Sequence, residues 1–179
     1  MTTENTFWRD GNRVPIEGHG LVVSKTLTFT GDDATVATPV FRVTGVVEVL
    51  KLWGVVTVAL GANQTDCHFR INDQTATDQI ITKATTLTLN SASAGAMIAK
   101  TGLITAVAKY FSADAAVFVE PTTLQTQIFT PFIVTQKTGG IQTDIEWVYT
   151  TTDDPTSGSI QFFAGYLPLS EGAKLESAT

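Results

Sequence analysis

The sequence predicts an all-β fold, and two observations support this prediction. The longest apolar stretch, residues 39–61, is rich in valine. Side chains branched at Cβ favour strands because a helical turn restricts their χ1 angle. Short alternating segments also recur along the 179 residues, separated by turns rich in glycine, asparagine and aspartate. About eight to ten strands spaced in this way are typical of a single-domain β-sandwich, and we expect a jelly-roll-like one.

The apolar stretch itself predicts two adjacent strands in the middle of the sandwich. Within residues 40–50 the odd positions are uniformly apolar, whereas the even positions are mixed and include Arg42 and Glu48. This period of two indicates a strand with one face in the core. Residues 55–60 are almost wholly apolar and predict a second strand buried on both faces, with Gly54 as the break. A single buried helix is the alternative, but the charged residues would spread around its whole circumference.

Further strands are expected on both sides of this stretch. Residues 21–30 alternate cleanly, with Leu21, Val23, Leu27 and Phe29 on one face. In residues 141–150, the alternation places Ile141, Ile145, Trp147 and Tyr149 on the core side and Gln142, Asp144, Glu146 and Thr150 on the other. Residues 137–140 predict a hairpin turn, and Pro131 predicts an edge or a bulge. Shorter strand candidates are 67–71, 80–81, 87–89, 115–120 and 160–166, and a short helix over 102–110 is possible.

The domain organisation has three parts. Residues 20–169 form the β-sandwich domain, preceded by an irregular N-terminal arm (1–19) and followed by a polar C-terminal tail (170–179) that is frayed or used for contact. The arm has no consistent period, yet it carries large apolar side chains that need somewhere to dock. They pack either on their own domain or on a neighbouring subunit. The candidate contacts with another subunit or with a partner protein are Phe7, Trp8, Arg9 and Arg13.

Charge and composition limit the possible partners. The net charge is −6: residues 1–110 hold nine basic and nine acidic groups, whereas residues 111–179 hold two basic and eight acidic ones. Such an acidic part repels phosphate, so we expect no nucleic acid as a partner. Threonine is abundant and charged residues are only 16% of the chain. This composition suits a surface that is buried against other subunits.

Targeting signals are not visible in the sequence. The N-terminus lacks a basic segment followed by an apolar one, so no signal peptide is expected. No apolar run is long enough and free enough of charge for a membrane helix. The single cysteine excludes an intramolecular disulfide. We expect a protein made in a cytoplasm that needs no membrane partner.

No motif for metal or nucleophilic chemistry stands out. Asp66, Cys67 and His68 are consecutive, so in a strand they point to alternate faces and cannot converge on one zinc ion. The loop with Asn72, Asp73 and Asp78 lacks a dense calcium pattern. With two histidines in the chain and no G-x-S-x-G segment, a serine triad is disfavoured. We expect a buried, inert Cys67 thiol, and neither a metal nor another cofactor.

Two carboxylates and four aromatic residues remain as weaker candidates. Asp144 and Glu146 share one strand face, with α-carbons about 7 Å apart, which is the kind of pair that glycosidic cleavage uses. A solvated strand face is the simpler interpretation. Carbohydrate binding by exposed aromatics is conceivable, although the alternation turns two of the four toward the core. These aromatic residues are Trp53, Trp147, Tyr149 and Tyr166.

The sequence resembles the head-decoration, cement and fibre-base proteins of tailed bacteriophages. Two passages resemble them most: GLVVSKTLTFTG at 20–31, and KTGGIQTDIEWVYTTTDDPTSGSIQFFAGYLPLS at 137–170. The resemblance implies a jelly-roll-like sandwich, often a homotrimer, that binds the major capsid protein or another virion protein. The expected function is therefore non-enzymatic and structural, located in the virion. The alternative is a virion-attached or fibre-associated module that binds a cell-surface carbohydrate, and the scarcity of histidine disfavours a cupin-type enzyme.

Overall fold

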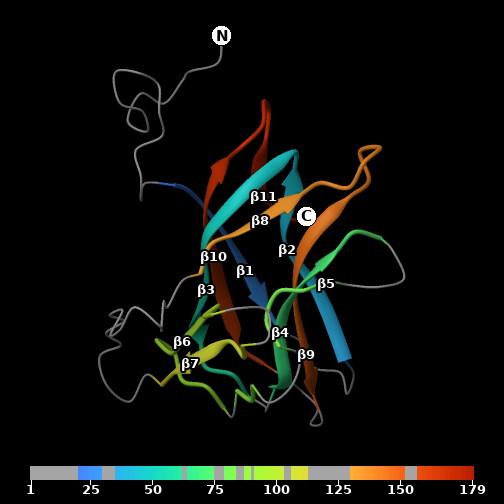
Figure 1. The fold of residues 1–179 in the computed structure, drawn as a ribbon. Coiled ribbons are helices and arrows are strands. Elements are labelled where there is room, and N and C mark those ends of the chain that lie inside the picture. Colours follow the sequence, from blue (N-terminus) through green and yellow to red (C-terminus); the bar gives the residue numbers. More distant parts are fainter. Residues whose placement is uncertain are drawn as a thin grey trace.

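The protein is an all-β sandwich of two antiparallel sheets packed face to face (Figure 1). The computed structural model describes residues 20–29, 35–61, 64–74, 79–83, 87–89, 91–102, 106–112, 130–151 and 157–179, and these ranges contain no helix. The predicted fold class is confirmed. The finer jelly-roll topology stays a prediction.

The larger sheet has six strands and is built around β3. Its order is β1-β10-β3-β6-β7, and β8 also pairs with β3. Strands β8 and β6 share one edge of β3 end to end, because β8 pairs with Val46–Val49 and β6 pairs with Trp53–Val55. The strand bounds are β1 (Leu21–Thr28), β3 (Val46–Val58), β6 (Met97–Ala99), β7 (Lys109–Phe111), β8 (Phe132–Thr135) and β10 (Ser159–Pro168).

The smaller sheet has five strands in the order β11-β2-β9-β4-β5, with β9 at its centre. A register shift in the pairing of β2 with β9 lies between Pro39 and Phe41, and one in the pairing of β4 with β9 lies between Thr65 and His68. The strand bounds are β2 (Thr35–Thr44), β4 (Gln64–Asn72), β5 (Gln79–Ile80), β9 (Thr143–Thr151) and β11 (Lys174–Ser177).

The core lies between the sheets and contains a cluster of three aromatic rings. Trp147 on β9 and Phe69 on β4 belong to the smaller sheet, and Phe162 on β10 belongs to the larger one; all three are fully buried. The ring of Phe162 lies 5.2 Å from that of Trp147 and 5.8 Å from that of Phe69, measured between centroids. The predicted alternation in β9 and β10 directs side chains inward, as the burial of Ile145, Trp147, Ile160 and Phe162 shows. Ile141, also predicted on the core side, is 38% exposed and lies before β9, so this part of the prediction was wrong.

The break within the apolar stretch is at Gly45, so its predicted position at Gly54 was wrong. Gly45 has a φ of +65° and separates β2 from β3, which belong to opposite sheets rather than pairing as neighbours. Gly54 lies inside β3, directly opposite Phe162. A Cβ atom there would lie 2.9 Å from side-chain atoms of Ile160 and Phe162, so glycine makes room for the core.

Three other expectations differ from the structure. Residues 55–60 are not buried on both faces, because Val58 is 56% exposed. The C-terminal tail is not frayed: β11 pairs with β2 and buries Leu175. The described part of residues 102–110 shows no helix, and β7 begins there at Lys109. The hairpin turn at 137–140 is confirmed by the Lys137–Ile141 bridge that closes it.

Replacing Gly54 with alanine should destabilise the sandwich, because its Cβ would overlap two core side chains. We expect the free energy of unfolding to fall by about 1–3 kcal/mol, the usual effect of overpacking. The matched control is Gly165→Ala on the paired strand β10, where the new Cβ would meet only Lys51 at an ordinary 3.8 Å. Urea denaturation of both variants measures the difference, and equal stabilities would contradict this packing.

Candidate functional site

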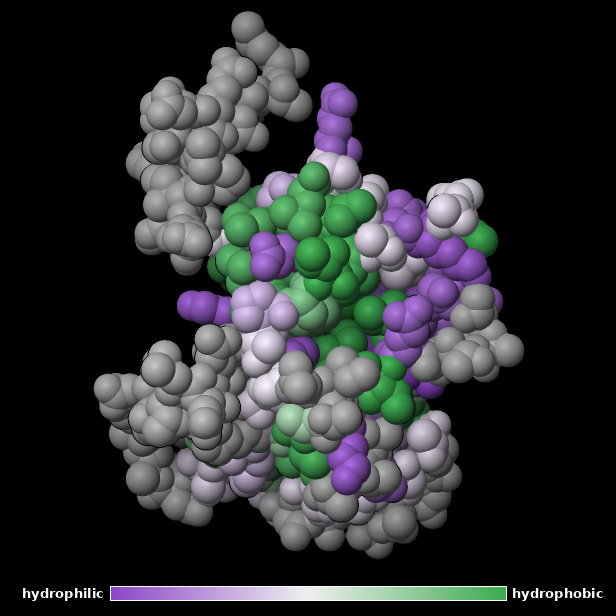
Figure 2. All heavy atoms as spheres, in the orientation of Figure 1, coloured by the Kyte–Doolittle hydropathy of each residue, from purple (hydrophilic) through white to green (hydrophobic). Residues whose placement is uncertain are grey.

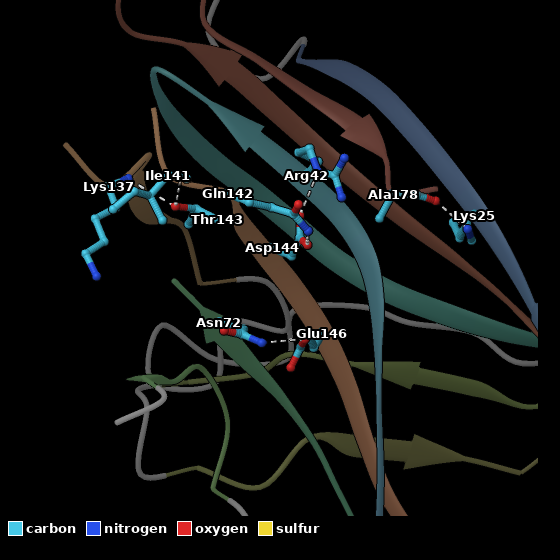
Figure 3. A network of polar contacts seen from close by, with 10 residues as sticks. All are labelled: Lys25, Arg42, Asn72, Lys137, Ile141, Gln142, Thr143, Asp144, Glu146 and Ala178. Atoms are coloured by element: carbon cyan, nitrogen blue, oxygen red, sulfur yellow. Dashed lines mark hydrogen bonds and ion pairs between the residues drawn. The ribbon is translucent and has the colours of Figure 1, made fainter. Parts of the chain in front are cut away.

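The two carboxylates singled out in the sequence lie on the outer face of β9. Their expected solvated setting was wrong, because Asp144 is 1% and Glu146 is 4% exposed. Each pairs with an arginine of a neighbouring strand. Figure 3 shows the pair of Arg42 with Asp144 and the contact of Asn72 with Glu146. The Nε atom of Arg42 on β2 lies 3.1 Å from Asp144 Oδ1, and the Nε atom of Arg70 on β4 lies 2.7 Å from Glu146 Oε2.

Amide side chains bind the other oxygen of each carboxylate. Gln142 donates to Asp144 Oδ2, and Asn72 donates to Glu146 Oε1 over 2.9 Å. Each carboxylate therefore has one arginine and one amide donor, so the pair is arranged to hold strands together. A carboxylate that is almost fully buried and whose two oxygens both bind donors of the protein is not presented to a substrate. The two pairs thus link β9 to both of its neighbouring strands.

Cys67 is fully buried, as expected. A register shift in β4 at this point places Asp66 at a φ of +53°, and the Nδ1 atom of His68 lies 2.7 Å from the carbonyl oxygen of Asp66. Burial, followed by the nearby charge of Asp66, raises the pKa of the Cys67 thiol well above its ordinary value. A thiol held protonated in this way is a poor nucleophile. Within the described ranges, no group of three or more potential metal-binding side chains comes together.

Several candidate residues lie outside the described residues. These are the arm residues Phe7, Trp8, Arg9 and Arg13, the loop residue Asp78 and the strand expected at 115–120. The proposed contacts of the arm therefore stay a prediction. In the part of the chain that is described, no long apolar helix suited to crossing a membrane is found.

The outer face of the larger sheet carries a group of apolar side chains that alternation alone did not single out. On β3 and β10, Trp53 and Phe163 are directly paired, and their rings stack with centroids 5.1 Å apart and planes 12° apart. Two residues further along β3, Val55 pairs with Met97 on β6, and Met97 pairs with Phe111 on β7. All five are only partly buried. We call them the outer aromatic patch: Trp53, Val55, Met97, Phe111 and Phe163.

The border of this patch on β1 is polar but uncharged. Three exposed residues of β1 lie on the same outward side as the patch: Ser24, Thr26 and Thr28. They pair, in this order, with Phe163, Gln161 and Ser159 of β10. An apolar centre with a hydroxyl-rich border is the usual composition of a protein–protein contact. The five apolar side chains come from four strands. Their convergence depends on the order β10-β3-β6-β7, which no local pattern in the sequence reveals.

Comparisons of the chain with family models, with curated proteins and with solved structures yield no match.

Replacing Arg42 with methionine should leave the buried Asp144 carboxylate without its cation. We expect the free energy of unfolding to fall by about 3 kcal/mol, the lower end for breaking a buried pair, because Arg42 is itself 34% exposed. The control is Lys174→Met, which breaks the exposed Lys174–Glu176 pair and should cost less than about 1 kcal/mol. Adding Asp144→Asn to the Arg42 variant should recover most of the loss in a urea titration. If it does not, the ion pair is not the cause.

Cys67→Ala should change how stability depends on pH. Because the native thiol has a raised pKa, it stays protonated above 9.0, where the unfolded thiol ionises, and native stability falls as the pH rises. This loss is about 1.4 kcal/mol by pH 10, and the alanine variant lacks it. Tyr149 is present in both proteins, and its pKa is raised by burial and then by Cys67, so only the Cys67 part of its shift differs between them. Denaturant titrations at pH 8 and pH 10 measure the difference; parallel losses would contradict the burial of the thiol.

Proposed function

We propose that the chain is a non-enzymatic structural protein of a virion, which assembles with other copies of itself through the outer aromatic patch. The observation that carries the proposal is the patch itself, a stacked Trp53–Phe163 pair continued by apolar side chains on the outside of a sheet. In a two-layer sandwich such an outer face is ordinarily polar, because it meets water. An apolar outer face marks a surface that another protein covers.

A second copy of the chain is the partner that its charges favour. The chain carries a net charge of −6, so two copies repel each other except where they meet through an uncharged surface. The outer aromatic patch and its border of Ser24, Thr26 and Thr28 are uncharged, although the exposed Lys51 lies beside Trp53 on the same face of β3. Association around a threefold axis, as the resemblance to phage decoration proteins implies, buries this face in a homotrimer.

The internal pairing of charges also supports a structural role. The buried carboxylates Asp144 and Glu146 are bound by arginine and amide side chains, so they link strands of the smaller sheet and are withdrawn from solvent. A protein that decorates a lattice needs rigidity and several points of attachment rather than an active site. In this proposal the major capsid protein or another virion protein is the lattice partner.

The stacked aromatic rings also favour a second candidate function, carbohydrate binding at the virion surface. Trp53 is the one tryptophan of the described residues that lies on an outer face, because Trp147 is fully buried. A flat indole surface can pack against a sugar ring. This candidate differs from the first in that it needs no self-association.

Removing the two stacked rings should dissociate the assembly. We expect the double variant Trp53→Thr/Phe163→Thr to sediment as a monomer and the wild-type protein as a trimer. The control Ile141→Thr, which removes a 38% exposed side chain from the hairpin of residues 137–141, should sediment like the wild type. Sedimentation velocity measures the masses, and circular dichroism verifies the fold of each variant. A folded double variant that sediments like the wild type would contradict assembly through the patch. The carbohydrate-binding function would be favoured if the wild-type protein is a monomer and binds a glycan on an array, and if replacing Trp53 abolishes that binding.

A further inference from the structure

A pocket opens where β6 and β8 leave a gap along the shared edge of β3. The two short strands pair with β3 on either side of residues 50–52. Lys100 follows the last residue of β6 at this point, and its backbone N–H donates to the carbonyl oxygen of Leu52. From the other sheet, β5 and Ile71 at the end of β4 face the gap. The edge of the sandwich is therefore not closed here by a continuous strand.

The pocket has a volume of about 540 Å³ and is mainly apolar. This volume lies within the roughly 300–1,000 Å³ of small-molecule sites. Figure 2 shows hydrophobic side chains gathered on this face of the molecule. Two isoleucines of the lining, Ile80 and Ile133, are 45% and 62% exposed. The apolar residues that line the pocket are Ile71, Ile80, Ile81, Pro131, Phe132 and Ile133.

Lys100 is the one cationic side chain in this lining, and it is 3% exposed. Its Nζ atom donates to the carbonyl oxygens of Gly102, over 2.9 Å, and Thr130, over 3.3 Å, and it lies 5.1 Å from the centroid of the Phe132 ring. Among the described residues, no carboxylate forms an ion pair with it. An ammonium group has three N–H donors, so one donor of Lys100 is not taken by an oxygen of the described chain.

A buried ammonium without a counter-ion among the described residues is costly, and this cost suggests what the pocket binds. Burial lowers the pKa of Lys100, because the charged form loses its hydration. A ligand carboxylate beside Nζ would restore the charged form, since an opposite charge at hydrogen-bond distance favours it. Binding energy would then come from both the charge pair and the apolar lining.

We propose that this pocket binds a small amphipathic carboxylate, with its carboxylate on Lys100 Nζ and its apolar body against Ile71, Ile81 and Phe132. A single negative charge matches the single cation. A phosphate would bring a second charge next to the carbonyl oxygens of Gly102 and Thr130, which repel it. The apolar lining likewise disfavours a small hydrophilic anion. The pocket is a separate site from the outer aromatic patch, so the proposal does not depend on assembly.

Isothermal titration calorimetry of the full chain with octanoate tests the proposal. We expect octanoate to bind, and octan-1-ol, which has the same chain and no charge, to bind at least tenfold more weakly. Lys100→Met should weaken octanoate binding at least tenfold without changing that of octan-1-ol. The matched control is Lys174→Met, which removes a lysine charge from β11 and should bind octanoate like the wild type.

A second variant keeps the test decisive if the buried position does not tolerate methionine. Ile133→Asp places a negative charge on a 62% exposed residue at the pocket. It should weaken octanoate binding at least tenfold, and more than it weakens octan-1-ol binding. The proposal is overturned if the wild type binds none of hexanoate, octanoate and decanoate, or if both pocket variants bind octanoate as tightly as the wild type.

Discussion

The contact of Phe162 with Trp147 and Phe69 is the interaction on which the rest of the sandwich depends. It joins β10, the second strand of the larger sheet, to β9 at the centre of the smaller sheet and to its neighbour β4, and all three rings are fully buried. Aromatic rings of this size dominate the energetics of a core and prefer tilted or edge-on contacts such as these. Room for Phe162 requires glycine at position 54 on the paired strand. Once this cluster fixes how the sheets face each other, alternation determines what every strand presents to the outside.

The two outer faces that result are chemically different. On the smaller sheet, the arginine–carboxylate pairs of Arg42 with Asp144 and of Arg70 with Glu146 cross-link β9 to both of its neighbours. Such pairs contribute little net stability, because burying their charges offsets the attraction, but leaving either charge alone would be costly. They therefore specify which strands lie next to β9. The larger sheet instead presents Trp53 and Phe163, and this contrast is why we place the association surface there.

Alternation and turn residues were enough to predict the fold class and the inward faces of β1, β9 and β10, because both are local properties of the chain. These local patterns could not show whether the apolar stretch changes from one strand to the next at Gly45 or at Gly54. Both are glycines within a valine-rich stretch, and only the partners in space show that one takes a positive φ while the other makes room for Phe162. The same holds for β11, which is short and polar and forms because β2 offers it an edge.

The candidate site was less predictable, because it depends on strand order. Asp144 and Glu146 have the spacing of a solvated strand face, and their burial follows from arginines that lie some 70 to 100 residues earlier in the chain. The outer aromatic patch and the pocket at Lys100 each draw on strands far apart in sequence. A local pattern carries no information about such convergence.

The absolute mass of the wild-type protein in solution tests the central claim most directly. Light scattering after size-exclusion chromatography, repeated over a range of protein concentrations, measures it without any substitution. Assembly through the outer aromatic patch predicts a stable species near three times 19.1 kDa. A protein that stays at 19.1 kDa at every concentration would contradict the claim that a second copy covers this face.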